Sequence, residues 1–194
     1  MPTADDPIAR FAAEFERAAR SEAFDASRAA LATVDASCRP SVRFVLVKAH
    51  GPRGFTFYTN FESRKANDLA AHPVAALAFH WHTTGVQVRI AGPVVREDDD
   101  VADAYFASRP RGSQIGAWAS PQSRPIRDRA ELEAKVAEFA ARFADAQVPR
   151  PPHWGGYRIV PDEIEFWYER PDRLHVREHF RRSDEGWTRT LLAP

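Results

Sequence analysis

Cysteine is almost missing from this sequence of 194 residues, which contains a single one, Cys38. No internal disulfide can form, so a reducing compartment suits the chain. The sequence also lacks any apolar run close to the ~18 residues of a membrane-spanning helix. Its first residues, MPTADDPIAR, lack the basic segment and apolar run of a secretory signal. From these absences we expect a cytoplasmic protein that does not bind membranes.

Net charge is absent as well, because 27 lysines and arginines balance 27 aspartates and glutamates. Nucleic-acid binding depends on neutralising phosphates with positive charge, so we expect no nucleic-acid partner. An anion site would instead need a local concentration of basic residues. Apolar residues make up 44% and charged residues 28% of the chain, as in ordinary globular domains. The length fits one compact domain, which we expect to span residues 1–194.

The spacing of apolar residues predicts a mainly β fold with several helices. Asp6 followed by Pro7 is typical of a helix start, so an amphipathic helix is predicted within an N-terminal segment, residues 1–28. Other predicted helices cover residues 64–72, 98–109, 114–120 and about 128–144. Predicted strands cover residues 29–34, 41–50, 55–60, 74–82 and 86–97, with more in the C-terminal tail. This alternation indicates an α+β fold in which a β-barrel over residues 29–194 carries helices packed outside.

Two basic clusters are candidates for binding an anion. Arg43 and Lys48 lie five positions apart on one predicted strand, so we expect them on opposite faces; a solvated surface is the alternative interpretation. Ser63, Arg64 and Lys65 stand at a predicted helix start. Basic side chains there oppose the helix dipole, but the unpaired backbone N–H groups attract a phosphate. The second cluster therefore predicts either a phosphate site or ordinary surface decoration.

A third cluster lies in the stretch YFASRPRGSQIGAWASPQS. Tyr105 and Arg109 are four residues apart and share a helix face, and Pro110 ends that helix. Ser113 is expected to cap the next helix. A phenol, a guanidinium, a hydroxyl and a helix start would then surround one point and could hold a phosphate. The alternative is a plain turn between helices, with Arg109 paired to a nearby acid.

The remaining polar residues do not predict another kind of active site. His80 and His82 face the same way on one strand, as do His175 and His179 on another, but neither pair has a third ligand at a matching spacing. We expect no metal. No Ser/His/Asp set and no P-loop is recognisable, and GPRG is a turn rather than a dinucleotide-binding loop.

Several segments, in their order along the chain, resemble one known family. They are LATVDASCRPSVRFVLVK, FYTNFESRKANDLAAHP, QVRIAG, YFASRPRGSQIGAWASPQS, VPRPPHWGGYRIVP, IEFW and RLHVR…GWTRTLLAP, and they extend over about residues 30–194. The chain resembles the pyridoxine/pyridoxamine 5′-phosphate oxidases, FMN enzymes that produce pyridoxal 5′-phosphate. The resemblance implies an FMN-binding split β-barrel, Greek-key-like, with C-terminal dimerisation strands. It also implies a homodimer with FMN at the subunit interface.

The resemblance assigns roles to individual residues. Arg64 and Lys65 would hold the FMN phosphate. The full set of implied FMN contacts is Arg43, Val45, Leu46, Lys48, Tyr58, Thr59, Arg64, Lys65, Gln87, Gln122, Ser123, Trp167 and Arg177. The implied contacts of the substrate phosphate are Lys48, Tyr105, Arg109 and Ser113. Arg173 and His175 would lie against the pyridine ring of the substrate. They are the catalytic candidates, because they would position this ring. A proton transfer by His175 is possible but not required.

The implied reaction is an oxidation by FMN. The flavin would take a hydride from the C4′ carbon of a small phosphorylated pyridine, and O2 would then reoxidise it and yield H2O2. With pyridoxamine phosphate, water would hydrolyse the resulting imine. Two alternatives stay open. One is a related FMN oxidase that acts on a different small molecule, as in phenazine biosynthesis, and the other is a noncatalytic protein that binds FMN or pyridoxal phosphate.

Three departures from the family pattern are expected to lie near the substrate rather than the flavin phosphate. Val176 stands where the family motif Arg-Leu-His-Asp-Arg has its aspartate, which could pair with Arg173 or Arg177. Val86 precedes Gln87 where the family usually has arginine. The N-terminal extension of the family is short or absent. We therefore expect the departures to affect the choice of substrate more than FMN binding.

Overall fold

The computed structural model describes residues 6–194. The first five residues, which belong to the predicted 1–28 segment and to the stretch inspected for a signal, lie outside the described residues. Within residues 6–194, no helix combines the length and the apolar character needed to cross a membrane.

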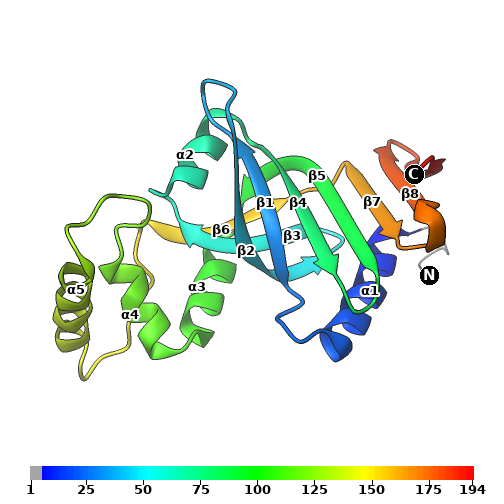
Figure 1. Ribbon diagram of the computed structural model, residues 1–194. Coiled ribbons are helices and arrows are strands. Elements are labelled where there is room, and N and C mark those ends of the chain that lie inside the picture. The colour runs from blue at the N-terminus through cyan, green and yellow to red at the C-terminus, as the bar shows by residue number, and fades with distance from the viewer. Residues whose placement is uncertain (1–5) are drawn as a thin grey trace.

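Six strands close a barrel, as the sequence predicts (Figure 1). Their order is β4-β1-β2-β3-β6-β5, and the pairing of β5 with β4 closes the ring. All the pairings are antiparallel. The bounds of these strands are β1 Arg28–Val34, β2 Pro40–Gly51, β3 Gly54–Asn60, β4 Val74–Trp81, β5 Val86–Arg96 and β6 Trp154–Ile159.

Strand β5 branches, so the sheet continues beyond the barrel. Its first half, Val86 to Ala91, pairs with both β4 and β7, whereas Val94 to Arg96 pair with β6. Gly92 lies at the branch, where a Cβ atom would come within 2.1 Å of the Val160 carbonyl oxygen. The extension consists of β7 Glu163–Tyr168, β8 Val176–Ser183 and β9 Gly186–Leu192, with a 3-10 turn at Pro171–Arg173.

The helices lie outside the barrel (Figure 1). Their bounds are α1 Pro7–Ser21, α2 Arg64–Ala71, α3 Asp99–Ser108, α4 Arg111–Ala119 and α5 Arg129–Arg142. The predicted start of α1 is confirmed, because the Asp6 carboxylate accepts a hydrogen bond from the Ile8 backbone N–H. The end of α3 is also confirmed, since Arg109 before Pro110 has extended backbone angles. The predicted cap at Ser113 is wrong: α4 begins at Arg111 after Pro110, and Ser113 lies inside its first turn.

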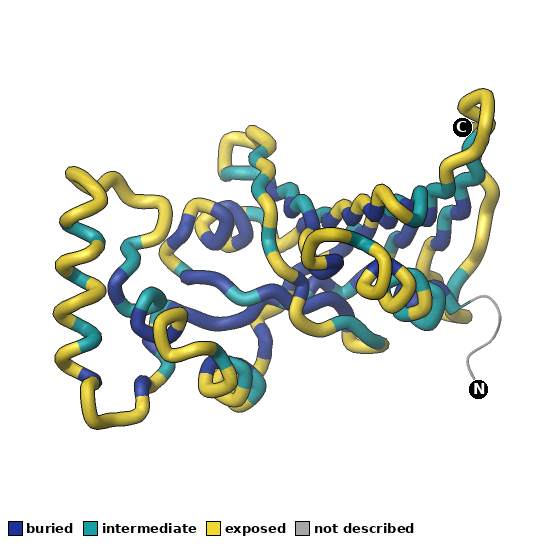
Figure 2. The backbone as a smooth tube through the Cα atoms, turned by 60° about the horizontal axis from the view of Figure 1, so that its bottom comes forward, coloured by how far each residue is buried: buried dark blue, intermediate teal, exposed yellow. Residues whose placement is uncertain are grey.

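Aromatic side chains dominate two apolar cores. The barrel core is closed by α1, whose Phe11 makes edge contacts with Phe55 and Phe79. A smaller core around Phe106 and Trp154 joins α3 and α4 to the start of β6. Helix α5 has no buried residue and stands at the edge of the molecule (Figure 2). The space between the barrel and the smaller core holds the candidate site.

Candidate functional site

A cavity of about 910 Å³ opens between β2, β3, α2 and the α3–α4 pair. Its size is in the range of cofactor and ligand sites. The predicted residues that line it are Arg43, Val45, Leu46, Lys48, Tyr58, Thr59, Arg64, Lys65, Tyr105, Arg109, Ser113, Gln122 and Ser123. Residues of all three basic clusters therefore face one shared space, although they are far apart in the sequence.

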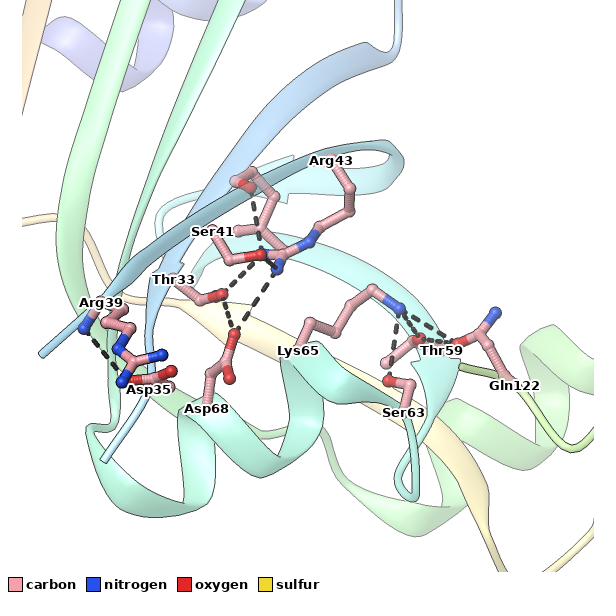
Figure 3. Close-up of polar contacts among 11 residues, drawn as sticks. Thr33, Asp35, Arg39, Ser41, Arg43, Thr59, Ser63, Lys65, Asp68 and Gln122 are labelled. Carbon is pink, nitrogen blue, oxygen red and sulfur yellow. Dashed lines mark hydrogen bonds and ion pairs between the residues drawn. The ribbon is translucent and has the colours of Figure 1, made fainter. Parts of the chain in front are cut away.

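Lys65 is a buried cation held by neutral oxygens (Figure 3). Its Nζ donates hydrogen bonds to Thr59 Oγ1 at 3.0 Å, to Gln122 Oε1 at 3.0 Å and to Ser63 Oγ at 3.3 Å. No carboxylate of residues 6–194 comes within ion-pair distance of it. Burial, reinforced by the nearby charge of Arg43, lowers the pKa of Lys65 to about 8. The more distant Asp68 carboxylate offsets this only in part, and a buried cation without an ion-pair partner is costly, so this site favours a bound anion.

The N-terminus of α2 adds to this preference. Ser63 is the N-cap, but its side chain accepts from Lys65 and forms no capping bond to the helix backbone. Arg64 is the first helical residue, is exposed, and lines the cavity. The first turn of α2 contains no acidic residue. Two cations and unpaired backbone N–H groups therefore lie together at a helix start whose first turn holds no acid, which is the arrangement that binds phosphate.

Arg43, unlike Lys65, has a carboxylate within ion-pair distance (Figure 3). Its guanidinium donates to Thr33 Oγ1 at 2.6 Å and to Ser41 Oγ at 2.7 Å, and lies 3.5 Å from the buried Asp68 carboxylate. The Thr33 hydroxyl in turn donates to Asp68 at 2.6 Å. Arg43 thereby joins β1 and β2 to α2 and fixes the wall of the cavity beside Lys65.

Lys48 and Arg43 differ in exposure, as the strand alternation predicts. Arg43 is half-buried, whereas Lys48 lies on the exposed side of β2 and approaches Asp25 at 3.6 Å. A bulge between Val47 and Ala49 interrupts the pairing with β3 at this point. Both basic residues nevertheless line the cavity, which extends around the strand.

Three nearly parallel aromatic rings form the side of the cavity next to α3. The rings of Tyr58 and Tyr105 stack with centroids 3.9 Å apart, and Trp154 lies 5.4 Å from Tyr58 with an interplanar angle of 8°. Burial raises the pKa of Tyr58 to about 12 and raises that of Tyr105, so both phenols keep their proton at neutral pH. The Arg109 guanidinium carbon lies 4.7 Å from the Trp154 ring centroid.

Arg109 has a buried nitrogen without a partner. Its Nη1 forms no hydrogen bond to any of the residues 6–194, and no described carboxylate pairs with it. Burial lowers the pKa of Arg109, yet a guanidinium stays charged at any ordinary pH. The predicted alternative, in which Arg109 pairs with a nearby acid, is therefore wrong. The side chain instead brings a positive charge without a carboxylate partner to the cavity that it lines.

The other predicted site residues form a second group on the extended sheet, away from the cavity of the same chain. Gln87 of β5 lies opposite Trp167 of β7, which lies opposite Arg177 of β8. The His175 ring lies beside Trp167, with ring centroids 4.2 Å apart and an interplanar angle of 37°. Arg173 is exposed and has a positive φ of 62°, which is uncommon for a residue with a side chain. None of these five residues lines the cavity formed by residues 6–194.

Arg177 has a carboxylate partner despite the departure at position 176. Its Nε donates to Glu165 Oε1 at 2.8 Å and its Nη1 to the Ala193 carbonyl oxygen at 2.9 Å. The Glu165 hydrogen bond raises the pKa of Arg177. Strand alternation places Val176 on the side of the buried Phe180, away from Arg177.

The departure at position 86 lies away from the cavity as well. Val86 is fully buried in the barrel core and does not line the cavity formed by residues 6–194. The preceding turn is attached to the end of α1 through hydrogen bonds from Thr83 to Glu22. The turn and Val86 therefore belong to the packing of α1 on the barrel.

Sequence reasoning missed three residues of the site: Asp68, Trp154 and Glu165. Each holds or orients a predicted site residue from a distant part of the chain. Trp154 lies in VPRPPHWGG, whose quoted match to the family could have drawn attention to it. The acids carry no such local sign, because their partners are known only once β1, α2, β7 and β8 are packed.

The barrel and its cavity define a class of protein. A split barrel with an anion-binding helix start, a buried lysine and an unpartnered arginine is suited to bind phosphorylated ligands in one shared space. Comparisons with known proteins identify the class more closely. The profile of a family described as "Pyridoxamine 5'-phosphate oxidase" matches residues 15–143. A second, "Pyridoxine 5'-phosphate oxidase C-terminal dimerisation region", matches residues 154–194.

Curated relatives agree with the profiles. A pyridoxine/pyridoxamine 5'-phosphate oxidase of Anaeromyxobacter dehalogenans is 56% identical over 98% of this chain and 96% of its own length. One of Sphingopyxis alaskensis is 54% identical over 98% of this chain and 88% of its own. The chain belongs to the pyridoxine/pyridoxamine 5′-phosphate oxidase family, whose members are oxidoreductases.

Solved structures share the fold. The crystal structure of PhzG from Burkholderia lata 383, in complex with tetrahydrophenazine-1-carboxylic acid, has a TM-score of 0.91 and 33% identity, covering 97% of this chain and 93% of its own. An FMN-binding protein from Nostoc punctiforme, related to pyridoxamine 5'-phosphate oxidase, has a TM-score of 0.78 at 19% identity, with both chains fully covered. The second likeness supports the split-barrel fold only.

Proposed function

We propose that this protein is an FMN-dependent oxidase that converts pyridoxine 5′-phosphate or pyridoxamine 5′-phosphate to pyridoxal 5′-phosphate, reducing O2 to H2O2. One observation carries the proposal: Lys65 is a buried cation without a carboxylate partner among residues 6–194, beside the acid-free start of α2. That site fits a phosphate. The unpartnered Arg109 across the same cavity fits a second one, so both a flavin and a substrate phosphate can be accommodated.

The residues present fit FMN. Lys65 and Arg64 would hold its phosphate, with Gln122 and Thr59 keeping the Lys65 ammonium pointed at it. Arg43 would support this site from the wall, because its own donors are engaged by β1 and α2. Bound FMN would supply the redox chemistry, by accepting a hydride from the C4′ carbon of the substrate.

The chain itself would bind and orient the substrate. Arg109, Tyr105, Ser113 and Lys48 would anchor the substrate phosphate at the other side of the cavity. Holding one end of a small ring compound in this way fixes the distance and angle of its reacting carbon, which lowers the entropic part of the barrier. The protonated phenol of Tyr105 can donate to the phosphate at neutral pH.

We propose that the active species is a homodimer. Val42, Phe44 and Leu46 are 69%, 72% and 40% exposed on one side of β2, and all three line the rim of the cavity. Apolar side chains gathered in this way favour contact with another chain. The second group of predicted residues would then reach the cavity from the partner, with Arg173 and His175 against the pyridine ring. The family profile over residues 154–194 supports this arrangement by its description as a dimerisation region.

A direct test begins with the purified protein. Bound flavin is released and identified, and peroxide is measured with pyridoxine phosphate and with pyridoxamine phosphate. Arg109→Ala should raise KM for the phosphorylated substrate far more than it lowers flavin content. Arg127→Ala, a change of an exposed arginine whose side chain pairs with its neighbour Asp128, is the matched control. Equal losses of flavin and substrate affinity in Arg109→Ala would mean that this arginine serves the flavin instead.

The dimer can be tested separately. Phe44→Asp should shift the protein to a monomer in sedimentation velocity and release its flavin, because a carboxylate would be buried in the apolar contact. Val136→Asp on α5, where the side chain is 37% exposed, controls for a new surface charge. A Phe44→Asp protein that stays dimeric would exclude β2 from the interface.

A second candidate function is a related oxidase that acts on a different small molecule. The likeness to PhzG at 33% identity favours it, and the higher identity to curated pyridoxine/pyridoxamine 5'-phosphate oxidases opposes it. Full flavin loading with no peroxide from either vitamer would favour this alternative. Ligand binding without any oxygen consumption would instead indicate a noncatalytic carrier.

A further inference from the structure

The half-buried Arg109 contacts the ring of Trp154 rather than a carboxylate. The guanidinium lies over the Trp154 ring, with its carbon 4.7 Å from the ring centroid, and 5.5 Å from that of Phe106. Nη1 is buried and unpartnered within residues 6–194. By contrast, Arg177 is held by the carboxylate of Glu165.

The type of partner decides whether the charge and the N–H donors of an arginine remain available to a ligand. A carboxylate neutralises the cation and occupies its N–H groups, whereas the face of an indole attracts the cation and leaves the donors available. We propose that Trp154 is a positioning residue of the substrate-phosphate site: its ring holds the Arg109 guanidinium in place by a cation–π contact, so that charge and N–H donors stay directed at the bound phosphate. The inference rests on the proposed function.

Trp154 is itself firmly held, as a positioning residue must be. Its side chain is 6% exposed at the start of β6. Its backbone carbonyl oxygen accepts a hydrogen bond from Arg150 Nη1 at 2.8 Å, and its backbone N–H donates one to the Pro151 carbonyl oxygen at 3.0 Å. The ring packs edge-on against Phe106, 5.0 Å between centroids. The backbone of Trp154 is thereby held by hydrogen bonds, and its ring is held by packing against Phe106.

The same ring orders the second phosphate ligand. Trp154 lies parallel to Tyr58, and Tyr58 stacks on Tyr105 at 3.9 Å. Tyr105 and Arg109 belong to one end of α3, so a single indole supports the phenol and the guanidinium together. A merely space-filling Trp154 would contribute to the stability of the smaller core without a selective effect on phosphate binding.

The test uses the flavin-loaded protein with Trp154→Leu and Trp154→Phe. We expect Trp154→Leu to raise KM for pyridoxine phosphate about five- to tenfold with kcat and FMN content unchanged, and Trp154→Phe to fall between it and wild type, since benzene is the weaker cation–π partner. Trp118→Leu is the matched control, because Trp118 packs on α5 in the same core and does not contact Arg109. A KM rise of equal size in Trp118→Leu would overturn the proposal.

A double-mutant cycle separates positioning from packing. In an Arg109→Ala background, Trp154→Leu should raise KM much less than it does in the wild type, because the guanidinium is gone and only the support of Tyr105 is lost. Independent, multiplying effects would refute the inference. If Trp154→Leu does not fold, the same cycle is measured with Trp154→Phe, Arg109→Ala and the double variant of the two.

A readout without turnover keeps the two proposals distinguishable. The affinity of the FMN-loaded protein for inorganic phosphate, measured by calorimetry, should fall in Trp154→Leu and in Arg109→Ala, and in the double variant by less than the product of the two single effects. If this coupling is found while neither vitamer yields peroxide, the proposed function fails and the role of Trp154 stands. If peroxide forms and Arg109→Ala raises KM, but Trp154→Leu changes neither KM nor phosphate affinity, the role of Trp154 is refuted.

Discussion

FMN binding should weaken as the pH rises above 8, because the cation that we assign to the flavin phosphate is a buried lysine. Burial and the charge of Arg43 lower the pKa of Lys65 to about 8 in the protein without ligand. The ammonium form is then about 90% populated at pH 7 and about 10% at pH 9. If only this form binds the phosphate, the dissociation constant of FMN rises about tenfold between these two pH values. A lysine with the ordinary pKa of 10.5 would give almost no change.

The assay is a titration of the apoprotein with FMN, followed by quenching of flavin fluorescence, at several pH values from 7 to 9.5. Lys65→Arg is the control, because a guanidinium keeps its charge throughout and should make the affinity independent of pH over this range. Lys65→Met should bind weakly at every pH. A wild-type affinity that stays constant up to pH 9 would refute the reasoning, and so would a tenfold fall that persists in Lys65→Arg.

Three further predictions concern other parts of the molecule. Glu165→Gln should lower FMN affinity about fivefold in the same titration, because the charge-assisted bond that orients Arg177 becomes a neutral one; unchanged affinity would separate Arg177 from the flavin. Gly156→Ala should cost about 1–3 kcal/mol in urea unfolding, since its Cβ would meet Tyr58 at 3.0 Å and the Glu97 Cβ at 2.7 Å. For His50, burial against aromatic rings lowers the pKa from 6.5, so the native state favours the neutral ring and loses stability as the pH falls below 6.5. His50→Leu should make the urea midpoint less dependent on pH between 7 and 5, and an unaltered dependence would contradict this.

The sequence alone determined the boundaries and the type of most elements. The helix start at Asp6 and Pro7 and the helix end before Pro110 follow from the backbone geometry of proline and from a side chain that caps its own neighbours. The alternation in β2 predicted opposite faces for Arg43 and Lys48, and the first is half-buried while the second is exposed. Such features depend on residues a few positions apart, which is why a sequence pattern reveals them. Where two local rules compete, as at Pro110 and Ser113, the proline set the start of α4.

Only the tertiary structure decided which basic residues have a carboxylate partner and which have none among residues 6–194. Arg43 and Lys65 look alike in the sequence, yet Arg43 meets Asp68 across 25 positions, while Lys65 meets Gln122 across 57 and no carboxylate among residues 6–194. Arg109 rests on an indole, and Arg177 on a carboxylate of β7. The physical reason is that burial and partner identity depend on segments brought together when the barrel closes. The free energy of a charged side chain depends on its burial and on its charged neighbours, and these come from distant parts of the chain. A local sequence pattern therefore does not predict them.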